Sequence, residues 1–132
     1  MIKEFNIKKC MTCDKNESVL NLVAKMKKRK EKMVIVLNRG NPVGIITLSD
    51  IVFKGIASGK DLKKICAYEI SSKDIYHLDE KEDECRAYIY MFTHNHLFCI
   101  ITSKGKFKGV LNLSELIKKH AADYCNAQKK KS

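Results

Sequence analysis

Long apolar runs are absent from this sequence of 132 residues. No stretch approaches the roughly 18 consecutive apolar residues that a membrane-spanning helix needs. Charged side chains follow soon after Met1 with no continuous apolar core behind them, so no signal peptide is visible. We therefore expect a cytoplasmic protein with no membrane-bound part. The hydrophobic content of 45% is still that of a globular protein of ordinary domain length.

Catalytic motifs are missing as well. The sequence has no Gly-x-Ser-x-Gly, no glycine-rich loop of the kind that cradles phosphates and no His-Glu-x-x-His. The acids Asp50 and Glu115 have no histidine partner nearby in sequence, and nothing marks one cysteine as an activated nucleophile. We therefore expect a binding protein rather than an enzyme, with no catalytic residue and no required cofactor.

Six cysteines lie at positions 10, 13, 66, 85, 99 and 125. Without a secretion signal, reduced thiols are favoured over disulfides. Cys10 and Cys13 have the C-x-x-C spacing of a zinc site, but such a site needs a second pair of ligands and the sequence has no second C-x-x-C. A structural role for these two thiols is therefore favoured and no metal is predicted. A metal-binding or redox module remains the weaker hypothesis, which elemental analysis would test.

Positive charge exceeds negative charge by 11, and it is clustered. One cluster runs from Lys25 to Lys32, interrupted only by Met26 and Glu31, and a second comprises Lys118, Lys119 and the terminal lysines. Lysine-rich surfaces are usually solvated, but a stripe of like charge also attracts phosphates. The sequence lacks interleaved aromatics and any zinc-finger or RNP pattern. Nucleic-acid binding is accordingly kept as the alternative function.

The chain contains an internal repeat with a spacing of 65 residues. An apolar run, a glycine turn at Gly40 or Gly105 and a second apolar run occur in both copies, which predicts a β-hairpin in each. Each hairpin is followed by helical apolar spacing. Thr47 or Ser49 in the first copy, and Asn112 or Ser114 in the second, are the expected N-caps.

Helices are also expected before each hairpin, over residues 17–30 and 82–93, and after it, over residues 49–57 and 114–127. On the first helix the spacing of Val19, Leu22, Val23 and Met26 predicts a core face, and the second helix offers Cys85, Tyr88, Ile89 and Phe92 as counterparts. The predicted class is α+β. Residues 1–60 form the first repeat, residues 61–128 the second and residues 129–132 a basic tail.

Gly44-Ile45-Ile46-Thr47-Leu48-Ser49-Asp50 resembles the signature of the cystathionine-β-synthase (CBS) domain, which reads glycine, hydrophobic, any residue, Thr or Ser, any two residues, Asp. The second copy has Asn112 and Glu115 where the signature has a hydroxyl residue and aspartate. Met11-Thr12 is similar to the family's methionine-threonine start of a repeat, and Ile70-Ser71 is its counterpart. The resemblance extends from about Met1 to Gln128.

This resemblance implies a tandem CBS pair, often called a Bateman module, in which two small sheets packed on helices are related by a pseudo-twofold with two clefts between the repeats. It further implies a regulatory module that senses adenosine ligands such as AMP, ADP, ATP or S-adenosylmethionine. Thr47 and Asp50 would hold ribose and phosphate, with Ile45 and Ile46 near the adenine. Asn112 and Glu115 would occupy the same positions in a second cleft, weakened or differently selective.

In this family, residues just before the second strand of each repeat commonly line the cleft, which adds Lys32 as a match for phosphate and His96 as a group that responds to pH. Both are equally typical of solvated loops. The resemblance also implies a homodimer that pairs through helices and signals to an unidentified protein partner. Since no effector domain is left over in the sequence, we expect a stand-alone module.

Overall fold

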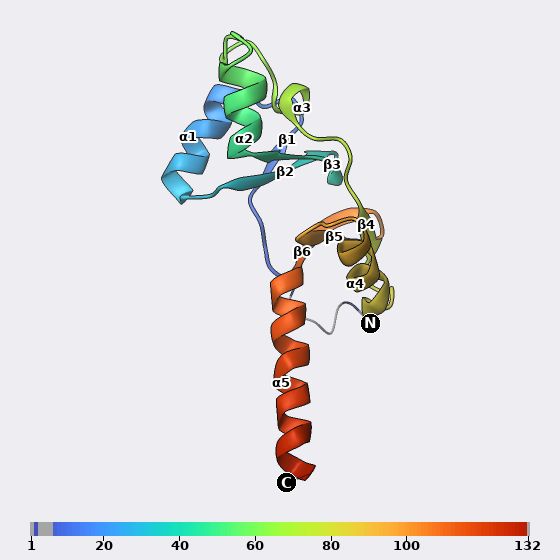
Figure 1. Ribbon diagram of the computed structural model, residues 1–132. Helices are drawn as coiled ribbons and strands as arrows, with labels where there is room; N and C mark the ends of the chain where they lie inside the picture. The colour runs from blue at the N-terminus through green and yellow to red at the C-terminus, as the bar shows by residue number, and fades with distance from the viewer. Residues whose placement is uncertain (1, 3–6, 132) are drawn as a thin grey trace. The chain divides into compact units, whose positions relative to one another are not determined.

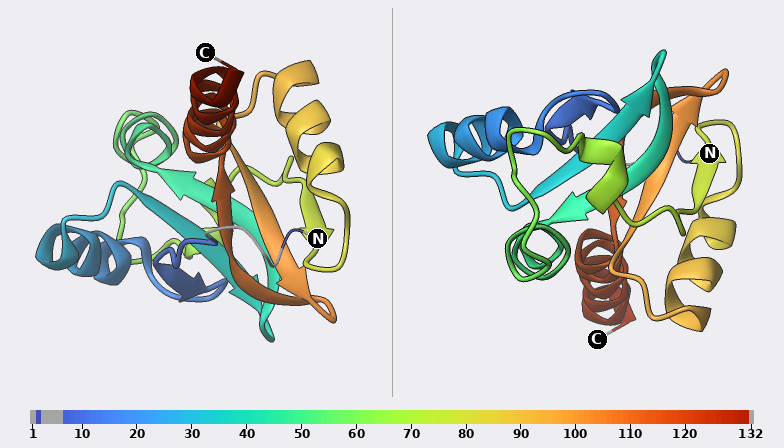
Figure 2. Two further views of the ribbon diagram at one scale, coloured as in Figure 1. Left: turned by 90° about the horizontal axis from the view of Figure 1, so that it is seen from below. Right: turned by 90° about the horizontal axis from the view of Figure 1, so that it is seen from above.

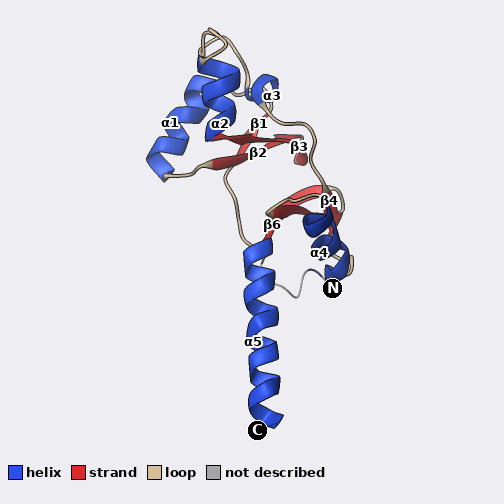
Figure 3. Cartoon of the chain, viewed as in Figure 1, coloured by secondary structure: helices blue, strands red, loops and turns tan. Residues whose placement is uncertain are grey.

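The computed structural model describes residues 2 and 7–131, and it shows helices and two small sheets (Figures 1 and 3). Each sheet has three strands, in the orders β1-β2-β3 and β4-β5-β6, which confirms the predicted α+β class. The elements in chain order are β1 (Thr12–Asp14), α1 (Val19–Arg29), β2 (Met33–Asn38), β3 (Asn41–Thr47), α2 (Leu48–Asp50), η2 (Ile51–Ile56), α3 (Ala67–Ile70), β4 (His77–Asp79), α4 (Glu84–Thr93), β5 (Phe98–Ser103), β6 (Lys106–Asn112) and α5 (Leu113–Lys131).

The described chain folds into two compact units. The N-unit contains Cys10–Tyr76 with Gly105–Phe107, and the C-unit contains the described residues among 1–9, 77–104 and 108–132. The predicted division between residues 60 and 61 concerns the sequence repeats rather than these units. It stays a prediction, as does the pseudo-twofold relation of the repeats.

Both predicted hairpins are present, and they turn in the same way. Arg39 and Gly40 have φ values of 52° and 85°, and Lys104 and Gly105 have 52° and 82°. Two successive residues with positive φ are what a two-residue type I′ turn requires, and this turn matches the twist of the flanking strands. The turns therefore recur at the spacing of 65 residues that the sequence shows. Figure 2 displays the two hairpins as twisted ribbons, with α5 continuing from the end of β6.

The segment that leads into each repeat pairs with the last strand of the other repeat. Ser72 forms an antiparallel bridge with Ile45 of β3, and Lys8 forms one with Val110 of β6. Glycine makes this approach possible, because a Cβ on Gly44 would lie 2.6 Å from the Ser71 hydroxyl oxygen and a Cβ on Gly109 2.6 Å from the Lys8 carbonyl oxygen. The leading segments thus belong to units different from those of the repeats that they begin.

The core of the N-unit forms where α1 and the α2–η2 helix cover one face of the β1-β2-β3 sheet (Figure 1). Helix α1 begins after Ser18, whose hydroxyl oxygen accepts a hydrogen bond from the Asn21 N–H at 3.2 Å. Val19, Leu22 and Met26 are buried, and Val23 packs partly against them, as the sequence predicts. Burial of side chains of this size contributes about 1.5–3 kcal/mol each.

The predicted core face of α4 is wrong. Ala87 and Met91 are fully buried, whereas Ile89 and Phe92 are 62% and 54% exposed and Cys85 is exposed too. The buried pair lies 65 residues after Leu22 and Met26, so the repeat spacing points to the correct face. Hydrophobicity alone predicts the neighbouring face, because Cys85, Ile89 and Phe92 are all apolar, whereas the buried face also carries the charged Glu84 beside Ala87 and Met91.

The closing helices also differ in detail from expectation. The first runs from Leu48 to Ile56, close to the predicted residues 49–57, but its second part is a π-helix in which the Ala57 N–H donates to the Val52 carbonyl at 2.7 Å. Helix α5 continues through Lys131, beyond the predicted end at residue 127, so the described part of the predicted tail is helical and Ser132 lies outside the described residues. Within the described ranges, every helix is too short or too polar to span a bilayer.

Candidate functional site

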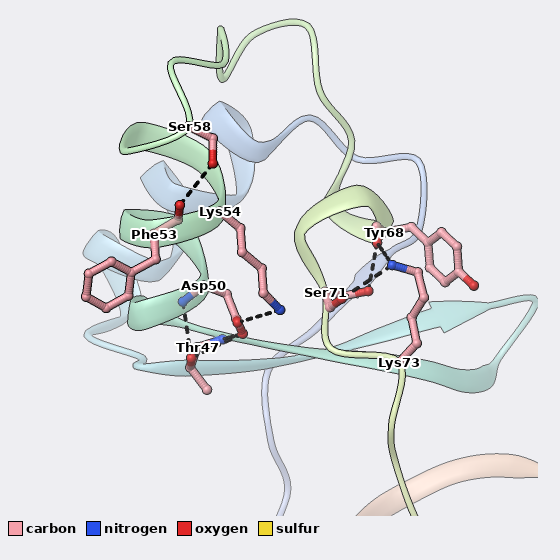
Figure 4. Close-up of polar contacts among 8 residues, drawn as sticks. All are labelled: Thr47, Asp50, Phe53, Lys54, Ser58, Tyr68, Ser71 and Lys73. Carbon is pink, nitrogen blue, oxygen red and sulfur yellow. Dashed lines mark hydrogen bonds and ion pairs between the residues drawn. The ribbon is translucent and has the colours of Figure 1, made fainter.

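The signature residues of the first repeat lie at the junction between β3 and α2. Thr47 is the last residue of β3 and the N-cap of α2, which confirms one of the two expected caps. Its hydroxyl oxygen accepts a hydrogen bond from the Asp50 N–H at 3.4 Å, and Asp50 Oδ2 accepts one from the Thr47 N–H at 2.8 Å. This reciprocal arrangement is a capping box. Thr47 and Asp50, which the sequence singles out, are therefore side by side in one exposed-to-half-buried turn (Figure 4).

The Asp50 carboxylate has two further contacts. The Thr47 hydroxyl donates to Oδ2 at 3.2 Å, and the Lys54 ammonium lies 3.1 Å from Oδ1. The Asp50 side chain keeps 14% of its surface exposed and Lys54 keeps 48%. In Figure 4 the Lys54 side chain runs along the helix to the carboxylate. The junction therefore presents a carboxylate, a hydroxyl and an ammonium group within a single turn of helix.

The two isoleucines of the signature differ in accessibility. Ile46 is fully buried in the core of the N-unit, and its expected position near an adenine ring stays a prediction. Ile45 is half-buried, and its main chain pairs with that of Ser72. The Ile45 N–H donates to the Ser72 carbonyl at 3.0 Å, and the Ser72 N–H donates to the Ile45 carbonyl at 2.8 Å. Alternation along β3 explains the difference, because successive side chains point to opposite faces of a strand.

Lys32 lies on the rim of a groove of about 430 Å³ in the N-unit. The apolar part of the lining comes from α1 and the α2–η2 helix, and the polar rim from the end of α1 and the residues after it. Its lining residues are Val23, Met26, Lys27, Lys30, Glu31, Lys32, Leu48, Ile51 and Val52. Neither Thr47 nor Asp50 belongs to this lining. Lys32 therefore lies near the α2–η2 helix, which begins after Thr47. It lies on the apolar side of that helix rather than beside Thr47 and Asp50.

The second repeat builds its junction differently. Asn112 Oδ1 accepts hydrogen bonds from the Ser114 N–H at 2.8 Å and from the Ser114 hydroxyl at 2.7 Å, so Asn112 acts as the capping side chain. Glu115 is paired with Lys8, whose ammonium lies 2.6 Å from its carboxylate. This hydrogen bond and the positive charge of Lys8 hold the pKa of Glu115 below its ordinary value. Each signature acid therefore has a lysine partner, from its own helix in one unit and from the leading segment in the other.

His96 is held by α4 of the C-unit. Its ring nitrogen Nδ1 is 2.9 Å from the Tyr90 hydroxyl, and its main-chain N–H donates to the Met91 carbonyl at 2.9 Å. The tyrosine ring also stacks on His94, with ring centroids 4.4 Å apart. His96 is therefore part of an aromatic cluster, and its expected role as a pH-responsive ligand contact stays a prediction.

The cysteines of the C-x-x-C pair are poorly suited to metal or redox chemistry. Burial and nearby acidic side chains raise the pKa of Cys10 to about 11 and that of Cys13 to about 12. No group of three or more His, Cys, Asp or Glu side chains that could hold a metal ion occurs in the described part of the chain. The metal-binding hypothesis gains no support from this geometry.

Lys54 and Lys8 are the site residues that sequence reasoning missed. Lys54 follows Asp50 by four residues on a predicted helix, and acid–lysine pairs at this spacing commonly meet, so the signal was available. Lys8 had no such signal, because 107 residues separate it from Glu115. Only the pairing of the leading segment with β6 brings these two side chains together.

Comparison with known families gives a match to the CBS domain over residues 2–57. An uncharacterized protein of Methanopyrus kandleri is 24% identical over 109 residues, which cover 81% of this chain and 56% of that protein. The chain thus spans little more than half the length of this relative.

Solved structures with the same fold include two that hold adenosine compounds. A CBS domain protein from Pyrobaculum aerophilum complexed with AMP is 18% identical, with a TM-score of 0.69 over 87% of this chain and 88% of that one. The CBS domain pair of protein MJ0100, in complex with 5-methylthioadenosine and S-adenosyl-L-methionine, is also 18% identical, with a TM-score of 0.69 over 92% of this chain and 96% of that one. These similarities extend the CBS-pair fold over nearly the whole chain.

Proposed function

We propose that this chain, which belongs to the CBS domain family, is a regulatory module that binds adenosine-containing ligands at the junction of β3 and α2. The observation that carries the proposal is the capping box that holds Thr47 and Asp50 together on the surface of the N-unit. Solved relatives of the same fold hold AMP, 5-methylthioadenosine or S-adenosyl-L-methionine, which supports adenosine compounds as the ligand class.

The chemistry of the junction suits a nucleoside. Carboxylate oxygens accept hydrogen bonds from the vicinal hydroxyls of a ribose, and the Thr47 hydroxyl orients the Asp50 carboxylate by donating to Oδ2. The exposed first turn of α2 adds a partial positive charge that favours anions, although this helix is short. These groups bind and orient a ligand, and none of them requires a catalytic role.

The second junction is proposed to be weaker or differently selective. Glu115 keeps the negative charge with one methylene more than Asp50. Asn112 offers an amide in place of the Thr47 hydroxyl, and its oxygen is used by Ser114. We also propose a homodimer and a cytoplasmic location.

The test is calorimetric titration of the purified, nucleotide-stripped protein with AMP, ATP and S-adenosylmethionine. Asp50→Ala and Thr47→Ala should each weaken binding at least about tenfold, because Asp50→Ala removes a charge-assisted hydrogen bond to the ligand and Thr47→Ala removes the hydroxyl that orients the carboxylate. Ser18→Ala is the matched control, since it removes the N-cap of α1 without touching the junction. It should lower the free energy of unfolding by about 1 kcal/mol and leave affinity unchanged.

The result that would overturn the proposal is equal affinity of the wild type and the Thr47→Ala, Asp50→Ala double variant for every adenosine ligand. A short duplex DNA in the same titration examines the alternative function. Exposed Lys27, Lys28 and Arg29 in the last turn of α1 would contact phosphates, and log affinity would then fall linearly with log salt concentration. Binding of DNA alone would favour the nucleic-acid reading.

A further inference from the structure

The Asp50 carboxylate is almost fully used before any ligand arrives. Each carboxylate oxygen accepts about two hydrogen bonds. Oδ2 already accepts two, from the N–H and the hydroxyl of Thr47, and Oδ1 accepts one from the Lys54 ammonium. About one acceptor position therefore remains, on Oδ1, beside the position that Lys54 occupies.

A ribose offers two neighbouring hydroxyl donors, so it needs a second acceptor position. The capping box fixes Oδ2, because Oδ2 accepts the hydrogen bond from the Thr47 N–H and releasing it would leave that N–H without this partner. Lys54 is the contact that is easiest to release, because its side chain is long and about half exposed, so its ammonium can return to solvent when the carboxylate takes another partner. Binding of a ribose through both hydroxyls therefore displaces Lys54.

The displaced ammonium remains next to the bound ribose, where the charge of the ligand decides whether it finds a partner. A phosphate on the ribose would receive it in a charge-assisted hydrogen bond. An uncharged nucleoside would leave it to solvent, and a ligand with a cationic sulfonium would repel it.

We propose that Lys54 is a specificity-determining residue, which makes the junction select phosphorylated adenosine ligands over uncharged or cationic ones. This inference rests on the proposed function and names the ligand class within it. A lysine also lies beside the signature acid of the second repeat, where Lys8 pairs with Glu115. Lys8 comes from the leading segment, so this pair does not depend on the four-residue helical spacing that brings Lys54 to Asp50.

The test compares the affinities of the wild type and of Lys54→Gln for AMP, adenosine and S-adenosylmethionine by calorimetry at one salt concentration. Lys54→Gln should weaken AMP binding about tenfold, the loss of one hydrogen bond to a charged group. Binding of adenosine and S-adenosylmethionine should be unchanged or tighter, because Oδ1 is freed. Lys54→Arg should restore the preference for AMP, since it restores the charge. Lys60→Gln is the control for net charge, as Lys60 is an exposed lysine that follows η2.

The outcomes separate the inference from the function on which it rests. An AMP-to-adenosine affinity ratio that is the same in the wild type and in Lys54→Gln would overturn the role of Lys54 and leave adenosine binding intact. A similar fall in the ratio for Lys60→Gln would also overturn it, because the effect would then be general electrostatics. If the wild type binds none of the three compounds, the proposed function fails and the inference fails with it.

Discussion

Local hydrogen bonding defines the candidate site more than any distant contact. Thr47 and Asp50 are three residues apart, and the same contacts that start α2 also orient the carboxylate. A sequence motif can therefore predict this geometry, since everything it needs lies within one turn. Glu115 illustrates the opposite case, because its partner Lys8 is distant in sequence and no local pattern indicates it. The burial of the Ile46 side chain is likewise not indicated by a local pattern, because it depends on the core to which α1 contributes.

Lys30 is the residue for which the backbone makes the sharpest prediction. It follows α1 with a φ of 57°, and its N–H donates to the Lys27 carbonyl, so it adopts the left-handed conformation that usually selects glycine after a helix. Asn95 has a φ of 59° at the equivalent position of the second repeat, and asparagine tolerates this conformation better than lysine. Lys30→Gly should therefore raise the free energy of unfolding by about 1 kcal/mol.

Urea denaturation would measure this change in the free energy of unfolding. Asn95→Gly is the matched control, and its free energy of unfolding should rise by less. A loss of stability in Lys30→Gly would contradict the prediction and would mean that the lysine side chain itself contributes to the core through its aliphatic stem. Lys30 also lies on the rim of the groove that Lys32 lines.

At the scale of elements, the glycines and the repeat spacing carry most of the predictive information. Both hairpins, their turns and the helices around them follow from patterns within about 15 residues, because turn chemistry and apolar spacing act locally. The core face of α4 did not follow from apolar spacing, since the helix has two adjacent apolar stripes and the spacing alone does not distinguish them. The repeat decides correctly here: Ala87 and Met91 match Leu22 and Met26 in spacing and burial.

Gly44 belongs to the CBS signature, and it also lies where the segment of Ser71 and Ser72 pairs with β3. Its lack of a side chain allows Ser71 and Ser72 to pass close to β3, and a Cβ at this position would lie 2.9 Å from the Ser71 Cβ and 3.2 Å from the Ser72 carbonyl oxygen. Gly44→Ala should therefore shift the leading segment away from β3 and lower the free energy of unfolding by about 1–3 kcal/mol.

Thermal denaturation of Gly44→Ala beside Gly55→Ala provides the comparison. The nearest atom to a Cβ on Gly55 is the end of the Leu62 side chain, 3.1 Å away, which can rotate, and alanine favours the helix. Gly55→Ala should thus be close to neutral. Equal melting temperatures for Gly44→Ala and the wild type would show that the segment of Ser71 and Ser72 is free to move away from β3 at no cost.

At the scale of the whole molecule, the division into compact units was not predictable from the repeat alone. The sequence repeats meet near residue 60, but Ser72 pairs with Ile45 and Lys8 with Val110, so each unit takes in the leading segment of the other repeat. This exchange of leading segments between the two units depends on pairing between segments that lie far apart in sequence. The repeated hairpins and helices, in contrast, predict the mixed α+β class, and composition gives the excess of positive charge directly.

The proposed homodimer follows from apolar surface that a soluble monomer rarely leaves in contact with water. In the N-unit, Leu48, Val52, Phe53 and Ile56 of the α2–η2 helix are 47%, 45%, 68% and 59% exposed. Neighbouring exposed apolar residues on one helix are typical of an interaction surface. Sedimentation velocity should therefore give twice the monomer mass, and Phe53→Ser with Ile56→Ser should shift the chain toward the monomer.

Charge gives this prediction a second and independent readout. Two chains that each carry a formal charge of +11 repel one another, so raising the salt concentration should tighten the dimer by screening that repulsion. Leu20→Ser, which alters an exposed leucine on α1, is the control and should leave the mass unchanged. A monomer mass at every protein and salt concentration would refute the homodimer, and a dimer that dissociates as salt rises would mean that ion pairs rather than apolar helix faces hold it.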